Sequence, residues 1–225
     1  MRAAVAVISG ILALASPVLA DSLDAILGRM DKAAPAFHQM TANISKIEYT
    51  AIINDTSVES GSVWIRRAGR DMEMRTEITR PEPRMAGLHD ETAEVYYPKI
   101  NTVQIYNLGK MRGLVDQFLL LGFGTTGKEL LANYEIKPGG ETTVEGRPAT
   151  RIDMVPKSRK VLENFKLIQM WIPNDSAYPI RIRMVQPSGN YYEVTYSNLK
   201  LNPNLPASDF RLHLPANVHK EYPQK

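Results

Sequence analysis

A stretch of two-residue alternation constrains the fold of this chain more than any other feature. Between Asp71 and Ile78 charged and apolar side chains alternate, which is the period of a β-strand. The preceding run Val63–Ile65 is rich in strand-forming residues, and Ala68-Gly69 supplies a turn between the two segments. The sequence therefore predicts a β-hairpin over residues 61–78.

The two faces of this predicted hairpin differ in character. Met72, Met74 and Ile78 share the apolar face. The other face carries Asp71, Glu73, Arg75 and Glu77, and we expect it to be wet. Methionine is flexible and adapts to surfaces of variable shape. Such a face either covers an ordinary core or forms the wall of a lipid-sized cavity, and the pattern alone fits both.

The first twenty residues have the pattern of an export signal. Arg2 precedes a short apolar run, and Val18-Leu19-Ala20 has small or apolar residues where a signal peptidase reads. We therefore expect residues 1–20 to be a signal peptide, cleaved after Ala20, and the mature protein to be periplasmic. The chain contains no cysteine, which excludes disulfides and a lipid-modified N-terminal cysteine.

The remaining residues 21–225 are enough for a single domain with a sizeable core, and no linker or internal repeat divides them. The formal net charge of the whole chain is only +3. A charge this small does not support a nucleic-acid-binding function.

The mature chain reads as one helix followed by a meander of strands. Ser22 can cap a helix whose apolar face carries Leu23, Ile26, Leu27 and Met30. From Thr41 the period changes to two. Ile47, Tyr49, Ala51 and Ile53 then alternate with Lys46, Glu48 and Thr50. Further strands are predicted at 58–66, 85–89, 94–97, 102–107, 134–137, 147–155, 165–171, 180–186, 191–201 and 210–214. Consecutive strands of this kind predict an antiparallel sheet.

Two short helices are predicted between Gly109 and Tyr134, on either side of a glycine-rich break. Their apolar residues, among them Phe118–Leu121 and Leu130-Leu131, exceed what one face of a surface helix needs. The two helices therefore either cap a cavity or simply plug the sheet as core.

No pattern in the sequence predicts catalysis, a metal or a cofactor. Gly122–Lys128 fits a phosphate-binding glycine motif, but Glu129 stands where a P-loop has Ser or Thr, and its carboxylate would repel phosphate. The flanking strands also lack the parallel setting that such loops need. The four histidines have no metal-ligand spacing, and no G-x-S-x-G elbow is present. We expect a binding protein and not an enzyme.

Several short motifs together resemble a known family. Gly61–Arg67 is similar to a strand that ends in an aromatic, an aliphatic and two basic residues, and Asp90–Pro98 is similar to a following hairpin. Tyr196-Ser197-Asn198 and Phe210–Pro215 are similar to the closing segments. In order and spacing these motifs resemble the LolA-type periplasmic carriers of outer-membrane lipoproteins, over nearly the whole mature chain.

The resemblance implies an α+β, mainly β fold. It comprises a curved antiparallel half-barrel sheet, an N-terminal helix and short lid helices over the concave face. It also implies a monomeric carrier that binds acyl chains of lipoproteins or related lipids and delivers them toward the outer membrane. An inner-membrane release complex and an outer-membrane acceptor are the implied partners. The alternative is an envelope regulator that senses lipid or lipoprotein. Such relatives usually carry a second domain, and the short stretch after Leu201 favours the carrier.

The residues expected to bind the ligand come from the hairpin and the lid. They are Trp64, Met72, Met74, Ile78, Phe118, Leu121 and Leu131. The resemblance further implies that Arg67 hydrogen-bonds the backbone of the lid and acts as a latch. The alternative is that Arg67 is an exposed arginine in a turn, next to Arg66 and Arg70.

Overall fold

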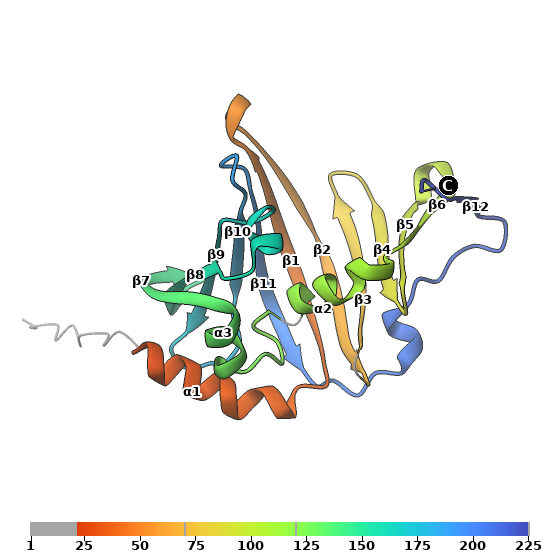
Figure 1. Cartoon of the computed structure of the whole chain (residues 1–225). Coiled ribbons are helices and arrows are strands. Elements are labelled where there is room, and N and C mark those ends of the chain that lie inside the picture. Colours follow the sequence, from red (N-terminus) through yellow and green to blue (C-terminus); the bar gives the residue numbers. More distant parts are fainter. Residues whose placement is uncertain (1–21, 70, 120, 225) are drawn as a thin grey trace, which may run out of the picture.

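The computed structural model describes residues 22–69, 71–119 and 121–224 (Figure 1). The predicted signal peptide and Arg70 lie outside the described residues. The strands are β1 (Gln39–Thr50), β2 (Asp55–Ala68), β3 (Asp71–Arg80), β4 (Arg84–His89), β5 (Thr92–Tyr97), β6 (Thr102–Asn107), β7 (Tyr134–Val144), β8 (Arg147–Pro156), β9 (Leu167–Pro173), β10 (Arg181–Val185), β11 (Tyr191–Leu201) and β12 (His219–Glu221). The α-helices are α1 (Leu23–Ala33), α2 (Arg112–Leu119), α3 (Gly127–Asn133) and α4 (Arg159–Leu162). Short 3₁₀ turns lie at Ala34–Ala36, Ala51–Ile53, Pro98–Ile100, Gly109–Met111 and Ala207–Phe210.

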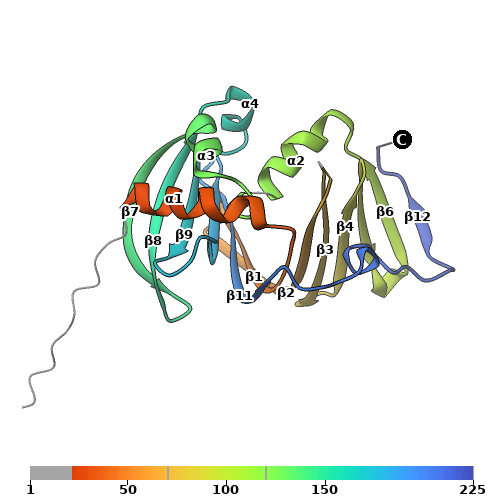
Figure 2. The ribbon, with the colours of Figure 1, turned by 90° about the horizontal axis from the view of Figure 1, so that it is seen from below.

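These twelve strands form one sheet in the order β12-β6-β5-β4-β3-β2-β1-β11-β10-β9-β8-β7. Every neighbouring pair is antiparallel except β12 and β6, which are parallel. Figure 2 shows the sheet curved into an open trough, with α2, α3 and α4 on its inner side and α1 crossing one end. The α+β, mainly β half-barrel with an N-terminal helix and helices over the concave face is therefore confirmed.

The N-terminal helix begins as the sequence predicts. The Ala25 N–H donates to Ser22 Oγ at 3.2 Å, and Ile26 and Met30 are buried. A hydroxyl at this position satisfies one of the N–H groups that a helix start leaves open. The helix packs against α3 at Gly127, where a Cβ would lie 2.7 Å from the carbonyl oxygen of Leu27. A glycine is therefore required for α1 and α3 to approach this closely.

Two apolar clusters hold the helices on the sheet. One joins α1 and α3 to β8, β9 and β10, with Ile26, Leu130 and Ile168 at its centre. The other joins β1, β2 and β3 to the loop after α2, where Phe123 is 1% exposed. The rings of Phe37, Phe123 and Tyr178 pack together beside this second cluster.

The segment after β11 differs from the prediction. Residues 210–214 form no strand; Phe210 instead ends a 3₁₀ turn and is fully buried against the outer face of the sheet. The last strand is β12, which pairs with β6 at the edge. This segment also covers Glu73, which is 4% exposed and bonded to Arg211, so the expectation that the charged face of β3 is wet was wrong at that residue.

Candidate functional site: an apolar cavity beneath α2

The register of the β2–β3 hairpin determines which side chains face the trough. Ala68 pairs with Asp71, and therefore Ile65 pairs with Met74 and Val63 with Thr76. Because successive side chains alternate between faces, Val63, Ile65, Met74 and Thr76 lie on the concave side of the sheet. Trp64 and its partner Arg75 lie on the convex side.

A cavity of about 340 Å³ lies between this concave face and the segment that begins with α2. Its apolar wall is formed by Ile44, Val63, Ile65, Met74, Ile78, Ala86, Phe118, Leu121, Ile182, Met184, Val194 and Tyr196. Its other lining residues are Lys46, Thr76 and Arg84. The volume falls at the lower end of the range of small-molecule sites, which are mostly apolar with few polar groups.

The structure brings four of the seven predicted ligand-binding residues to this cavity, namely Met74, Ile78, Phe118 and Leu121. Met72 shares their face of β3 but is fully buried in the neighbouring core cluster. It supports the floor of the trough and does not line the cavity.

Trp64 and Leu131 lie elsewhere and do not line this cavity. Trp64 is on the convex face, where the Arg75 guanidinium lies 4.0 Å from the centre of its ring. Leu131 is 47% exposed because α3 turns its neighbour Leu130, fully buried, toward α1. Adjacent helical residues point about 100° apart, so both leucines cannot face the core.

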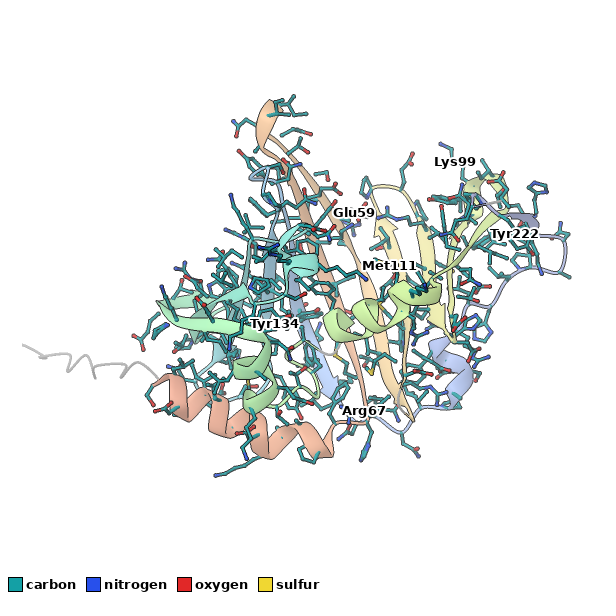
Figure 3. All side chains as sticks on the ribbon, in the orientation of Figure 1. Glu59, Arg67, Lys99, Met111, Tyr134 and Tyr222 are labelled. Carbon is teal, nitrogen blue, oxygen red and sulfur yellow. The ribbon has the colours of Figure 1, made fainter. Side chains whose placement is uncertain are left out.

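The segment after α2 is fastened to the sheet by Arg67. Its Nη2 donates to the carbonyl oxygen of Gly124 at 3.0 Å, between α2 and α3. Arg67 therefore does contact the backbone of the covering segment and is not simply an exposed arginine in a turn (Figure 3).

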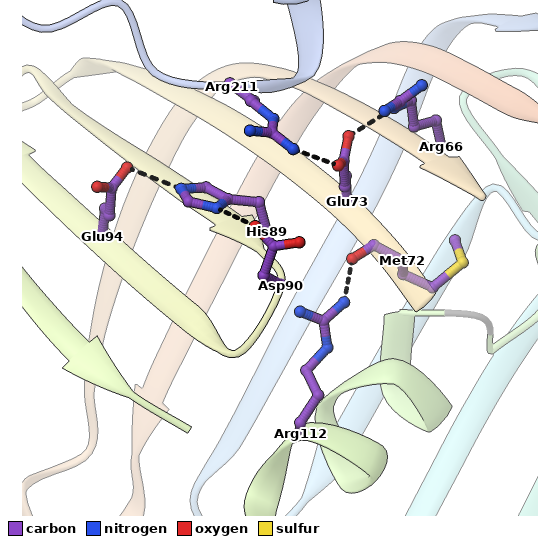
Figure 4. Close-up of polar contacts among 8 residues, drawn as sticks. All are labelled: Arg66, Met72, Glu73, His89, Asp90, Glu94, Arg112 and Arg211. Atoms are coloured by element: carbon purple, nitrogen blue, oxygen red, sulfur yellow. Dashed lines mark hydrogen bonds and ion pairs between the residues drawn. The ribbon is translucent and has the colours of Figure 1, made fainter. Parts of the chain in front are cut away.

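A second arginine contact runs in the opposite direction and was not predicted. Arg112, the first residue of α2, is 7% exposed and donates through Nη2 to the carbonyl oxygen of Met72 on β3 (Figure 4). A cation at the N-terminus of a helix opposes the helix dipole, so its position in the sequence is a signal that it serves a tertiary contact. The helix is thus tied to the sheet at its start by Arg112 and just beyond its end by Arg67.

The glycine-rich break between the helices is a constrained turn. Gly122 and Gly124 have φ values of +80° and +87°, and a Cβ on Gly122 would overlap the ring of Pro179. Glycine is the residue that adopts this backbone without steric cost.

The start of α3 explains why the P-loop-like pattern lacks a phosphate site. The Glu129 carboxylate accepts hydrogen bonds from the N–H and the hydroxyl of Thr126, both at 2.8 Å, and Thr126 Oγ1 accepts from the Glu129 N–H. This capping box satisfies the helix start with groups of the chain itself.

The aromatic residues of the cavity, Phe118 and Tyr196, add no charge to its wall. Phe118 packs edge-on against Phe165, with ring centres 5.2 Å apart, so α2 also contacts the segment before β9. Burial raises the pKa of Tyr196 to about 12. Its phenol therefore stays neutral at physiological pH and adds no charge to the cavity.

A larger cleft of about 630 Å³ adjoins the cavity at Leu121 and is more polar. It is lined in part by Arg67, Thr125, Glu129 and Asn133. Among the residues that the structure describes, no group of three or more His, Asp or Glu side chains could hold a metal ion. Within the same part of the chain, no helix is long and apolar enough to cross a membrane.

We compared the sequence with those of known proteins. No protein-family model matches the sequence. An outer-membrane lipoprotein carrier protein of Legionella pneumophila (strain Paris) is 29% identical over 185 residues, which are 81% of this chain and 83% of the relative. The protein of the same name from Dechloromonas aromatica (strain RCB) is 25% identical over 159 residues, covering 71% of this chain and 69% of the relative.

Solved structures with the same fold are more distant in sequence. An uncharacterized conserved protein from Thermus thermophilus has a TM-score of 0.54 at 13% identity, over 88% of this chain and 96% of that chain. MucB has a TM-score of 0.50 at 14% identity, over 86% of this chain and 63% of that chain. The resemblance predicted from the motifs is confirmed: this chain has the expected half-barrel and is similar in sequence to the outer-membrane lipoprotein carriers of the LolA type.

Proposed function

We propose that this protein is a periplasmic carrier that holds acyl chains of lipoproteins, or of related lipids, in the cavity beneath α2 and delivers them toward the outer membrane. The observation that carries the proposal is the apolar cavity of about 340 Å³, covered by a segment that two arginines tie to the sheet. The names of the relatives support lipoprotein as the cargo.

The physical task of a carrier fits this arrangement. Removing an acyl chain from water is favourable by about 0.8 kcal/mol per methylene, so the chain must be shielded during transit. The carrier must also release it, which requires a cover that opens. Hydrogen bonds with a charged donor are worth about 1.5–3 kcal/mol each, so the bonds of Arg67 and Arg112 can hold the cover closed without locking it.

The proposal includes the partners that the resemblance implies. An inner-membrane complex would load the carrier, and an outer-membrane acceptor would receive the cargo. We expect the protein to act as a monomer, as the resemblance implies. We also expect it to have no catalytic activity, because the cavity wall offers apolar side chains, two cations and a threonine but no paired acid and base.

Native mass spectrometry of the mature protein, isolated from a bacterial periplasm, tests this function. Co-purified acylated species, and uptake of a triacylated lipopeptide followed by its transfer to acceptor vesicles, are the expected results. Binding without transfer would favour the sensing alternative. A ligand-free protein that also ignores lipopeptides would contradict the proposal.

A further inference from the structure

Three charged side chains meet at one end of the apolar cavity: Lys46 of β1, Glu59 of β2 and Arg84 of β4. Lys46 and Arg84 line the cavity itself. Lys46 Nζ lies 3.3 Å and Arg84 Nη2 lies 2.6 Å from the same carboxylate oxygen, Glu59 Oε2. Figure 3 labels Glu59 on β2, on the side of the cavity toward the projecting β1–β2 hairpin.

The cavity wall changes from apolar to charged between one concave-face residue and the next. Lys46 is the next residue after Ile44 on the concave face of β1, and Arg84 pairs in register with Ile78 across β3 and β4. Ile44 and Ile78 both line the cavity. A chain lying against them would therefore place its terminal group beside the two cations.

The cluster has one more cation than anion. The hydrogen bond from Arg84 is the main reason why the pKa of Glu59 lies below its usual value, so this carboxylate is ionised at neutral pH. A single carboxylate then faces both an ammonium and a guanidinium. Glu48 of β1 is a second anion near Arg84; it is exposed, lies farther toward the hairpin tip and attracts Arg84 more weakly than Glu59 does.

The cations have donors to offer a second anion. Both ion pairs end on Glu59 Oε2, and a guanidinium has five N–H donors in a fixed fork. The side chains of Lys46 and Arg84 are 29% and 28% exposed, so a ligand can reach them.

We propose that Lys46, Glu59 and Arg84 form a site for the anionic head group, a carboxylate or a phosphate monoester, of an acylated ligand whose chain occupies the cavity. The inference rests on the proposed carrier function. It narrows the ligands of that carrier to acylated molecules with an anionic head group. The cavity volume of about 340 Å³ suits a single acyl chain with one such head group.

The test compares three ligands that share a twelve-carbon chain: laurate, dodecyl phosphate and the uncharged monolaurin. Binding to the mature protein is measured by calorimetry below the micelle concentrations, with inorganic phosphate as a competitor. The variants are Arg84→Met, which removes a cation, and Glu59→Gln, which removes the competing anion. Arg80→Met, at an exposed position at the end of β3, is the matched control.

We expect Arg84→Met to weaken binding of the anionic ligands about ten-fold and Glu59→Gln to strengthen it, with monolaurin binding and the control unchanged. Opposite effects of two variants that disrupt the same ion pair cannot come from loss of structure. The tighter of the two anionic ligands identifies the head group, and displacement by inorganic phosphate would assign the site to phosphate.

Equal binding of all three ligands, unaltered by either variant, would overturn this inference and leave the carrier function standing. Failure of all three ligands to bind would also overturn it. Uptake of the triacylated lipopeptide by the same preparation would then leave the carrier function standing, and its failure as well would contradict the carrier function.

Discussion

Arg67 and Arg112 tie the segment that covers the cavity to the sheet from opposite directions. The first reaches from the sheet to the carbonyl oxygen of Gly124, and the second reaches from α2 to that of Met72. We predict that Arg67→Leu leaves the fold intact but accelerates hydrogen exchange across residues 112–131, because the covering segment loses a charge-assisted bond. Hydrogen exchange with mass spectrometry, with and without an acyl ligand, measures the effect.

The control for Arg67→Leu is Arg80→Leu, because Arg80 is exposed at the end of β3, and Arg70 lies outside the described residues. Exchange in the control should match the wild type. If Arg67→Leu also exchanged like the wild type, Arg67 would not act as a latch.

A substitution at Met74 distinguishes a cavity wall from a packed core. Its side chain is partly buried and lines the cavity, so Met74→Glu would place a carboxylate where the acyl chain is proposed to lie. We predict that it weakens laurate binding by about ten-fold or more while reducing the free energy of unfolding far less. Calorimetry and urea denaturation measure the two effects.

Trp64→Ala is the matched control for Met74→Glu on the opposite face of the hairpin. It should cost roughly 0.5–1 kcal/mol of stability through loss of the Arg75 contact, and leave ligand binding unchanged. Equal losses of binding and stability in Met74→Glu would indicate a packed core.

Glu73 makes the stability of the folded protein depend on pH. Burial raises the pKa of its carboxyl, but hydrogen bonds from Arg66 at 2.5 Å and Arg211 at 3.1 Å outweigh burial, and the pKa lies below 4.5. A carboxyl with a lowered folded-state pKa stabilises the protein above its unfolded-state pKa, and this stability is lost as the pH falls through the folded-state value. We therefore predict that stability decreases below pH 4.5.

Urea denaturation of Glu73→Gln at neutral and acidic pH measures this contribution. The variant should be less stable than the wild type at neutral pH, and its stability should decrease less on acidification. Glu135→Gln, at an exposed position of β7, should follow the wild type. If Glu73→Gln kept the full pH dependence of the wild type, that dependence of stability would come from other groups.

At the scale of the elements, the packing of α3 on α1 depends on Gly127. A methyl group there would lie 2.7 Å from the carbonyl oxygen of Leu27, whereas a methyl group on Gly113 of α2 would meet nothing within 4 Å. We predict that Gly127→Ala is destabilising and that Gly113→Ala is neutral or stabilising by up to about 1 kcal/mol, the helix-propensity gain. Thermal unfolding measures both variants, and equal effects would exclude the close contact.

The sequence predicted the elements better than the faces they present. The Ser22 cap and both short helices follow from local preferences, whereas the turn comes later than predicted, because Ala68 still belongs to β2 and pairs with Asp71. The face of Trp64 follows from register, which one residue of shift would reverse. Counting outward from the predicted turn pairs Trp64 with Glu73, which already places it on the face opposite Met74; its partner is instead Arg75, because Ala68 pairs with Asp71.

The face of β1 could not be derived from alternation. The alternation of Ile47 and Tyr49 with Lys46 does not say which set faces the trough. In the structure Lys46 faces the cavity, and Tyr49 stacks on Tyr191 with ring centres 4.9 Å apart. The strand is apolar on its concave side at Met40 and Ile44, near the core, and charged at Lys46, where the cavity ends. The change from apolar to charged side chains along this one face depends on tertiary contacts, and the same holds for the Lys46–Glu59–Arg84 cluster.

At the scale of the whole molecule, one sheet has two differently covered faces. The inner face carries α2, α3 and the cavity, whereas the outer face of β3 and β4 is covered by the segment after β11, where Leu212 packs against Gly87. Phe210 and Arg211 bury Glu73 on that outer side. The outer face of β3 and β4 is thus covered by the chain itself, and the proposed cavity lies on the inner face.

A photo-crosslinking experiment tests the central claim, that acyl chains bind in the cavity beneath α2. The mature protein would be irradiated with a laurate analogue that carries a diazirine in its chain, and labelled peptides would be identified by mass spectrometry. We predict labels on Met74, Phe118 and Met184, all of which line the cavity, and competition by unlabelled laurate. Labels on convex-face residues such as Trp64, or labelling that excess laurate does not reduce, would contradict the claim.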